Sequence, residues 1–503
     1  MKAKFPFVCS LLFSFHFLLV GSARAQLTLN ELGYSPDSPL SLKDCIEIAL
    51  GGNPSHQKYK MNITLSNSNV MAAYGNFLPY ISGGYTVTED RYFNPTFLSP
   101  EGNAQTLPVT VTTPGDTSAT FNDLNGDGIL TSDEVTPRIT SPITSVFPIA
   151  EGKRKFSGGQ IQISQTLFAG GRNFYTLKSA KQLRKSSEFS LDRDQQLLAY
   201  NISQAYFEVL AKQQMLELAE RVLEQRKEQL RLAKARYKVG SVTKLDVMQA
   251  DIDLGNQENE LLQAEQELKI ARMELNRLMG IFLEESFQVV EDSVLFAPSF
   301  NMRELVQKAL RTRPDLKTLE AELASYENNI WAERSSYLPT VTFDLSIFRS
   351  EQGGADDKWT LSPENRDTRF GFSLNWDIFS GFSREYLIKQ AQVSAQNSRY
   401  DILDKKLLIE KEVKEAVLNL ERIYSQSLIT RKNRELAKEN LALERERYRL
   451  GSASLLDLRT AQVTYIQAET DHISKLLEFR TTLAQLEYAT GLEIKEGEIG
   501  GRI

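Results

Sequence analysis

Apolar residues recur every seven positions along three long stretches of the chain. The three series are Leu216, Leu223, Leu230 and Tyr237; Leu254, Leu261, Leu268 and Leu275; and Ile429, Leu436, Leu443 and Leu450. A seven-residue apolar period is typical of helices that pack on one another as coiled coils. No proline occurs between Pro148 and Pro298 or after Pro363, so the pattern predicts long, uninterrupted helices.

Four shorter segments have an apolar period of two instead. The clearest alternation is at Val341, Phe343, Leu345 and Ile347, and at Phe370, Phe372, Leu374, Trp376 and Ile378. A weaker one is at Ile81, Gly83, Tyr85 and Val87, and at Ile161, Ile163 and Leu167. Such strands suit a membrane barrel with a wet interior or, alternatively, a soluble amphipathic hairpin. Four strands cannot close a spanning barrel, so a barrel would need strands from several chains.

The chain also repeats itself internally. The segment RYKVGSVTKLDVMQA, which begins at Arg236, matches RYRLGSASLLDLRTA, which begins at Arg447, at an offset of 211 residues. Closer to the N-terminus, LKDCIEIALGGNP from Leu42 matches MRELVQKALRTRP from Met302 at an offset of 260 residues. Self-similarity of this kind indicates that one structural unit has been duplicated.

The two repeats differ by an insertion, because the two offsets differ by 49 residues. The extra residues lie between Pro79 and Phe168, and we expect them to join two strands at the end opposite the helices, facing outside the cell. The predicted first repeat covers residues 26–290, with a β-hairpin at about 78–168 and the insertion at about 94–155. The predicted second repeat covers residues 291–503, with a β-hairpin at about 339–379.

The insertion contains a candidate calcium site. Residues 123–134 read DLNGDGILTSDE and fit the twelve-residue pattern of an EF-hand loop. The expected oxygen ligands are Asp123, Asn125, Asp127, Ile129 through its backbone carbonyl, Thr131 and Glu134. Neither flank predicts a helix, so a turn that binds no metal tightly is the alternative. Our hypothesis is that Ca²⁺ braces this extracellular segment and does not act as a signal.

The N-terminus predicts export. Lys2 and Lys4 precede an apolar run that ends in Ala23-Arg24-Ala25, so residues 1–25 are expected to be a secretory signal peptide. Its removal would change the formal charge from −6 to −9, and such an acidic chain is not expected to bind nucleic acid. No later apolar run of about 18 residues predicts a transmembrane helix.

Candidate catalytic chemistry is sparse. After the signal peptide the only histidines are His56 and His472, and no zinc spacing or phosphate-binding glycine loop occurs. Cys45 is the only cysteine there, so no internal disulfide is expected. We therefore do not expect an enzyme.

Together these features resemble the TolC-like outer-membrane efflux proteins, also called outer membrane factors. The resemblance covers nearly the whole mature chain and rests on SLKDCIEIALGGNPS from Ser41, FLPYISGGYTV from Phe77, SQTLFAGGR from Ser164 and the turns around Gly240 and Gly451. It implies a mainly α fold with duplicated long coiled-coil helical hairpins and two β-hairpins. In this fold a homotrimer forms a 12-stranded β-barrel in outer-membrane lipid and an α-helical tunnel in the periplasm.

The implied function is a passive export duct from the periplasm to the outside. Such a channel is one component of a tripartite efflux or type I secretion system, and it works with a periplasmic adaptor (membrane fusion protein) and an inner-membrane pump. The adaptor would meet two turns at the periplasmic tip, formed by Val239, Gly240 and Ser241 and by Leu450, Gly451 and Ser452.

The resemblance also implies a constriction at the tip, lined by Asp246, Asp457 and Tyr448. Rings of carboxylates there would favour cations. The alternative for both aspartates is a structural role at a helix N-terminus, where negative charge is favourable. Ala453 and Thr460 stand where some family members carry an arginine and an acidic residue, so the closing contacts here should differ.

Two rival functions remain open from the residues alone. A non-conducting periplasmic structural or adaptor protein built of coiled coils would explain the helices but not the strands in both halves. A calcium-regulated surface-binding protein would explain the insertion but not the paired turn motifs. The alternating strands therefore favour a transport channel.

Overall fold

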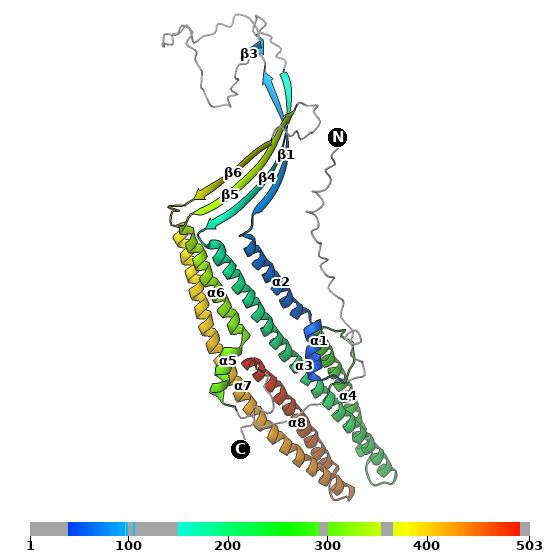
Figure 1. Cartoon of the computed structure of the whole chain (residues 1–503). Helices are drawn as coiled ribbons and strands as arrows, with labels where there is room; N and C mark the ends of the chain where they lie inside the picture. Colours follow the sequence, from blue (N-terminus) through cyan, green and yellow to red (C-terminus); the bar gives the residue numbers. More distant parts are fainter. Residues whose placement is uncertain are drawn as a thin grey trace, which may run out of the picture. The chain divides into compact units, whose positions relative to one another are not determined.

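The fold is described from a computed structural model of the chain (Figure 1). The described residues are 39–95, 97–98, 104–105, 149–290, 300–353 and 366–492. The expected signal peptide, residues 1–25, and the expected calcium loop, residues 123–134, lie outside them, so both stay predictions. Of the helices in the described ranges, none combines enough length and apolar character to cross a lipid bilayer.

The helices follow the order and spacing of the internal repeat. In chain order they are α1 (Leu42–Gly52), α2 (Pro54–Gly75), α3 (Arg172–Lys238), α4 (Lys244–Met279), α5 (Met302–Thr312), α6 (Pro314–Arg334), α7 (Ser383–Arg449) and α8 (Leu455–Thr490). Helices α3 and α7 have 67 residues each, and α4 and α8 have 36 each. The predicted long helices are therefore confirmed in both halves.

Local chemistry sets where several helices begin and end. A capping box, in which a Ser or Thr side chain and an Asp side chain satisfy each other's backbone N–H groups, opens α1, α4 and α8. Pro314 occupies the first turn of α6, where its missing N–H costs nothing. Helices α4 and α8 end at Gly280 and Gly491, whose φ angles of 76° and 67° favour glycine.

The chain divides into two compact units that do not follow the two repeats. One unit contains the helices, and the other, a strand unit, spans Gly75–Gly170 and Tyr337–Asp377. Each repeat contributes to both units. Within the helical unit, α3 packs on α4, α6 and α8, and α7 packs on α6 and α8 (Figure 1).

The strand unit is a four-stranded antiparallel sheet in the order β1-β4-β5-β6. Its strands are β1 (Tyr80–Pro95), β4 (Ile149–Ala169), β5 (Thr340–Gly353) and β6 (Arg366–Asn375). Short strands β2 (Phe97–Leu98) and β3 (Ala104–Gln105) pair separately. The first repeat supplies β1 and β4, and the second supplies β5 and β6, so the prediction of one hairpin per half is confirmed.

The register places apolar residues opposite one another on one face of the sheet. Ile81 pairs with Ile163, which pairs with Leu345, which pairs with Phe370. The next row brings the Phe343 and Phe372 rings to a centroid distance of 5.2 Å. On the other face, the Ser164 hydroxyl donates to Asp344 Oδ1 at 2.7 Å. The predicted division into an apolar and a polar face is confirmed.

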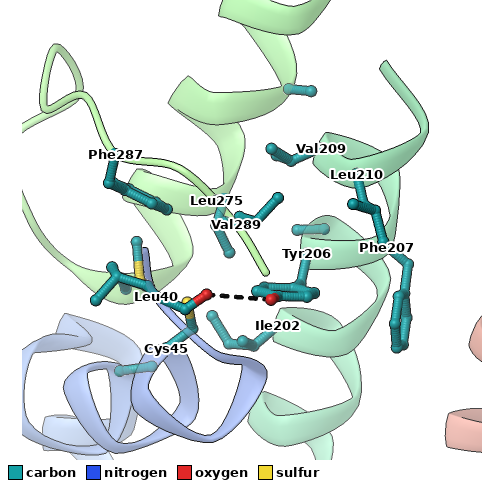
Figure 2. Packing of buried hydrophobic residues seen from close by; sticks show 14 of the residues in the cluster. Leu40, Cys45, Ile202, Tyr206, Phe207, Val209, Leu210, Leu275, Phe287 and Val289 are labelled. Atoms are coloured by element: carbon teal, nitrogen blue, oxygen red, sulfur yellow. Dashed lines mark hydrogen bonds between the residues drawn. The ribbon is translucent and has the colours of Figure 1, made fainter. Parts of the chain in front are cut away.

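The two largest apolar clusters among the described residues form the cores of the helical unit. Figure 2 shows part of the first core, where Leu40 and Cys45 pack against Ile202, Tyr206 and Leu275. The Tyr206 hydroxyl donates to the carbonyls of Leu40 at 3.1 Å and Val290 at 2.8 Å, so it holds together two segments far apart in sequence. Burial raises the pKa of the Cys45 thiol to about 12, which makes it a packing residue and a poor nucleophile. The second core lies among α5, α6, α7 and α8.

The three heptad series have different surroundings. Leu223, Leu230, Leu268 and Leu275 are buried within the chain, as expected for helices α3 and α4 packed on each other. The series on α7 is not covered, because Ile429, Leu436, Leu443 and Leu450 are 55–69% exposed. The heptad pattern of α7 therefore predicts a packing partner that the described part of the chain does not supply.

Candidate functional site

The two turns predicted at the tip have the same backbone structure. Gly240 and Gly451 have φ angles of 77° and 76°, so each supplies the left-handed residue that ends a long helix. Ser241 N donates to Arg236 O at 2.9 Å, and Ser452 N donates to Arg447 O at 2.8 Å. Both serine hydroxyls also donate to these carbonyls. The repeat thus builds one turn twice.

Asp246 and Asp457 open the helices that follow the turns. Asp246 Oδ2 accepts from both the backbone N and the hydroxyl of Thr243 at 2.8 Å. Asp457 Oδ2 accepts from Ser454 N at 2.9 Å and from its hydroxyl at 2.7 Å. The structural role suggested for these aspartates is therefore present, and it does not conflict with a position at a constriction.

The same hydrogen bonds affect protonation. The pKa of Asp246 is lowered chiefly by the backbone hydrogen bond from Thr243, and that of Asp457 chiefly by the side-chain hydrogen bond from Ser454. Both carboxylates are thus held in the charged form near neutral pH. Charged carboxylates can attract cations.

Apolar side chains are exposed at both turns. Val239 and Leu450 are 79% and 69% exposed, and Leu245 and Leu456, at matching repeat positions, are 71% and 69% exposed. Exposed aliphatic residues around a polar turn are a feature of surfaces that bind other proteins.

Polar contacts join the α3–α4 hairpin to the α7–α8 hairpin just behind the turns. Arg459 donates to Asp253 at 3.2 Å, and Arg226 Nη1 donates to Gln462 Oε1 at 2.7 Å. The Arg236 guanidinium lies 4.9 Å from the centroid of the Tyr448 ring. These three contacts link the first repeat to the second.

A cavity of about 510 Å³ lies between the same hairpins. Asp246 and Tyr448, two of the three residues predicted at the constriction, both line it, together with Asp253 and Arg459. Asp457 is not among its lining residues. The structure of one chain thus brings Asp246 and Tyr448 to one cavity and leaves Asp457 outside it.

Sequence reasoning missed Arg226, Asp253 and Arg459. Their partners are more than 200 residues away, so no local motif marks them. A comparison of the repeats contains a signal, because the positions that match Arg226 and Asp253 are Ala437 and Thr464. A charge that only one repeat carries is not needed for the fold that both repeats share, so such a position is a candidate for a separate role.

Thr460 stands where some family members carry an acidic residue. Its hydroxyl donates to Leu456 O within its own helix at 2.9 Å.

Comparison with known proteins agrees with this architecture. A family model described as outer membrane efflux protein matches residues 151–281 and 305–492. The pyoverdine export outer membrane protein OpmQ of Pseudomonas aeruginosa is 25% identical over 341 residues, covering 67% of this chain and 69% of that protein. The outer membrane protein TolC of Vibrio cholerae is 24% identical over 355 residues, covering 67% of this chain and 78% of that protein.

Solved structures share the fold. The CmeC outer membrane channel of Campylobacter jejuni has a TM-score of 0.66 at 15% identity, covering 93% of this chain and 89% of that one. The outer membrane protein VceC of Vibrio cholerae has a TM-score of 0.65 at 16% identity, covering 90% and 97%. The mainly α fold with a small sheet is therefore that of known outer-membrane channels, as the resemblance implied. Since the family model spans both repeats, this chain belongs to the outer membrane efflux protein family and is an export channel of the outer membrane, not an enzyme.

Proposed function

We propose that three copies of the chain form the working channel, with the sheets in the outer membrane and the helices in the periplasm. The observation that carries this proposal is the uncovered part of the heptad series on α7, Ile429, Leu436 and Leu443. Burial of an aliphatic side chain contributes about 1.5–3 kcal/mol, so three such residues favour a helix from another copy. Apolar residues at this seven-residue spacing pack against a second helix in a coiled coil.

The sheet supports the same assembly. Within the described residues, β1 and β6 are the edge strands, each paired on one side. An unpaired strand edge is costly in lipid, where no water can bind the free backbone groups. Pairing β6 of one copy with β1 of the next would remove every edge, and three copies would supply 12 strands, enough to close a spanning barrel. The apolar face, with Phe370 and Phe372 more than 70% exposed, would then meet lipid.

The turns are proposed to be the contact with a periplasmic adaptor, which would link the channel to an inner-membrane pump. Val239 and Leu450 would provide apolar contacts, and Gly240 and Gly451 would keep the turns narrow. The constriction is proposed to lie beside them, with Asp246, Tyr448 and Asp457 around the path of the exported substrate.

The test compares Leu436→Glu/Leu443→Glu with the control Lys432→Gln/Glu439→Gln, which changes exposed polar residues of the same helix. Native mass spectrometry in detergent measures the number of chains, and planar-bilayer recording measures conductance. We expect trimers and discrete steps from the wild type and the control, and loss of both from the leucine variant. Monomers of folded wild-type protein without conductance would refute the proposal.

A further inference from the structure

Exposed aromatic rings and basic side chains gather at the end of the helical unit where α3 begins and α6 ends. We name this set the aromatic–basic cluster; its members are Tyr74, Phe174, Tyr175, Lys178, Lys181, Trp331 and Arg334. Neither the turns nor the apolar cores use these side chains.

The cluster contains two sets of ring and cation contacts, one between α3 and α6 and one between α2 and α3, and the helical spacing of Phe174, Lys178 and Lys181 puts both on one face of α3. Lys178 Nζ lies 4.4 Å from the centroid of Phe174 and 5.9 Å from that of Tyr175. The Tyr175 ring stacks on Trp331 at a centroid distance of 5.9 Å, and the Arg334 guanidinium lies 4.9 Å from the Trp331 centroid. Lys181 Nζ lies 5.0 Å from the Tyr74 ring in the same way. Three helices therefore contribute to one surface.

This surface is open and positively charged. Tyr74, Phe174 and Trp331 are each about half exposed, at 47%, 49% and 50%. Lys178, Lys181 and Arg334 form no ion pair with any residue in the described part of the chain. Residues 172–188 contain five basic residues and one acidic residue, although the whole chain has a net charge of −6. Two of these basic residues are neutralised by carboxylates, since Arg172 pairs with Glu333 and Arg184 with Glu188, so the positive charge of the surface comes from Lys178, Lys181 and Arg334.

Chain connectivity limits how far the cluster can be from the strands. Helix α3 begins at Arg172, three residues after β4 ends at Ala169, and β5 begins six residues after α6 ends at Arg334. Since a chain spans at most about 3.6 Å per residue, these connections are at most roughly 10–20 Å long. If the strands span the membrane, as proposed above, the cluster lies at its surface.

We infer that the aromatic–basic cluster binds the headgroups of anionic phospholipids in the leaflet that faces the helices. Amphipathic rings are favoured at the level of lipid headgroups, and each Lys or Arg near an anionic surface adds attraction. Phosphate oxygens would accept hydrogen bonds from Lys178, Lys181 and Arg334, while Phe174 and Trp331 contact the glycerol and upper acyl region. This inference rests on the proposed membrane position of the strands.

The test uses the full-length channel in nanodiscs made with phosphatidylglycerol and phosphatidylcholine in equal amounts, at physiological salt. The variant Lys178→Gln/Lys181→Gln/Arg334→Gln removes three charges and keeps the rings. The matched control, Lys234→Gln/Lys269→Gln/Lys438→Gln, removes three exposed charges elsewhere on the helices. Lipids retained by the released protein are counted by native mass spectrometry.

We expect the wild type and control to retain phosphatidylglycerol preferentially, and the cluster variant to lose roughly tenfold or more of that preference. Lys178→Gln alone should lose part of it, which guards against misfolding of the triple variant. Equal preference in all proteins would overturn the inference, as would displacement of the lipid by inorganic phosphate at the same concentration. Trimer formation and conductance are measured on the same samples, so a channel that works without lipid preference rejects only this inference.

Discussion

Arg459 of α8 donates to Asp253 of α4 at 3.2 Å, and this ion pair connects the second repeat to the first near the turns. Arg459 is 38% exposed, so solvent screens the pair and we expect it to contribute only about 1 kcal/mol. Arg459→Gln should therefore raise amide hydrogen exchange in residues 236–250 roughly fivefold.

The control for this prediction is Arg231→Gln, because Arg231 pairs with Glu228 within one helix. It should leave exchange in residues 236–250 unchanged. The same increase in both variants would show that the loss of any positive charge near the turns raises the exchange rate, and that the pair with Asp253 is not its cause.

The roles of Asp246 and Asp457 can be separated from the caps that contain them. Thr243→Ala and Ser454→Ala remove the cap hydroxyls but leave the carboxylates, and the loss of a cap typically costs about 1 kcal/mol. Asp246→Asn/Asp457→Asn removes the charges. If the carboxylates line the constriction, bilayer recordings should show reduced cation preference only in the Asn variant. Equal preference in all variants would leave the aspartates as caps alone.

Loss of a charged partner of the buried Arg313 should strongly destabilise the fold. Its guanidinium is 1% exposed, donates to Asp315 and Ala489 O, and pairs with Glu412. Asp315→Asn should lower the free energy of unfolding by about 3 kcal/mol, because it leaves a buried cation partly unpaired. Chemical unfolding followed by circular dichroism measures the change. The exposed Asp251→Asn is the control and should stay within about 0.5 kcal/mol of the wild type.

Asp315 should also make the free energy of unfolding depend on pH. Burial by itself raises the pKa of Asp315, but hydrogen bonds from Arg313 and Lys405 outweigh it and hold the pKa well below the ordinary 3.8. The folded state therefore favours the charged form, so this stabilisation is complete above about pH 4 and is lost as the pH falls further. The difference between wild type and Asp315→Asn should be constant from pH 5 to 8 and shrink below pH 4. A difference that grows on acidification would contradict this assignment.

Glycines with similar φ angles should tolerate substitution differently. A Cβ at Gly280 would lie 2.3 Å from Gly52 O, whereas none of the neighbours of Gly240 comes within 4 Å of such an atom. Gly240→Ala should cost only the left-handed strain of about 1–2 kcal/mol. Gly280→Ala should cost at least about 3 kcal/mol, since two backbones must also separate. If both substitutions lower the free energy of unfolding equally, the backbones at Gly52 and Gly280 can move apart without cost.

The calcium loop remains a prediction from sequence. Limited proteolysis of intact cells should cut between residues 106 and 154 faster with chelator than with millimolar calcium. Glu134→Gln should abolish the difference, because it weakens the bidentate ligand that closes an EF-hand site. Cutting that does not depend on calcium in the wild type would reject the site.

Much of the fold could be predicted because its determinants are local or periodic. The turn motifs around Gly240 and Gly451 predicted both helix ends, and the alternation at Phe370 and Phe372 predicted a strand with an apolar face. Heptads are less decisive, since spacing shows that Leu436 needs a partner but not whether that partner belongs to the same chain. The exposure of this residue in the described part of the chain is what supports the proposed partner from another copy.

The duplication, the two turns between long helices and the strands follow from the sequence alone, because glycine and apolar periodicity act within a few positions of where they stand. The tertiary structure was needed to show which distant residues meet, both between the repeats and within each of them. Arg459 faces Asp253, and Asn53 and Arg313 donate to the equivalent carbonyls of Leu278 and Ala489. Burial and charge at such sites depend on side chains brought together from distant segments, and no spacing along the chain encodes that proximity.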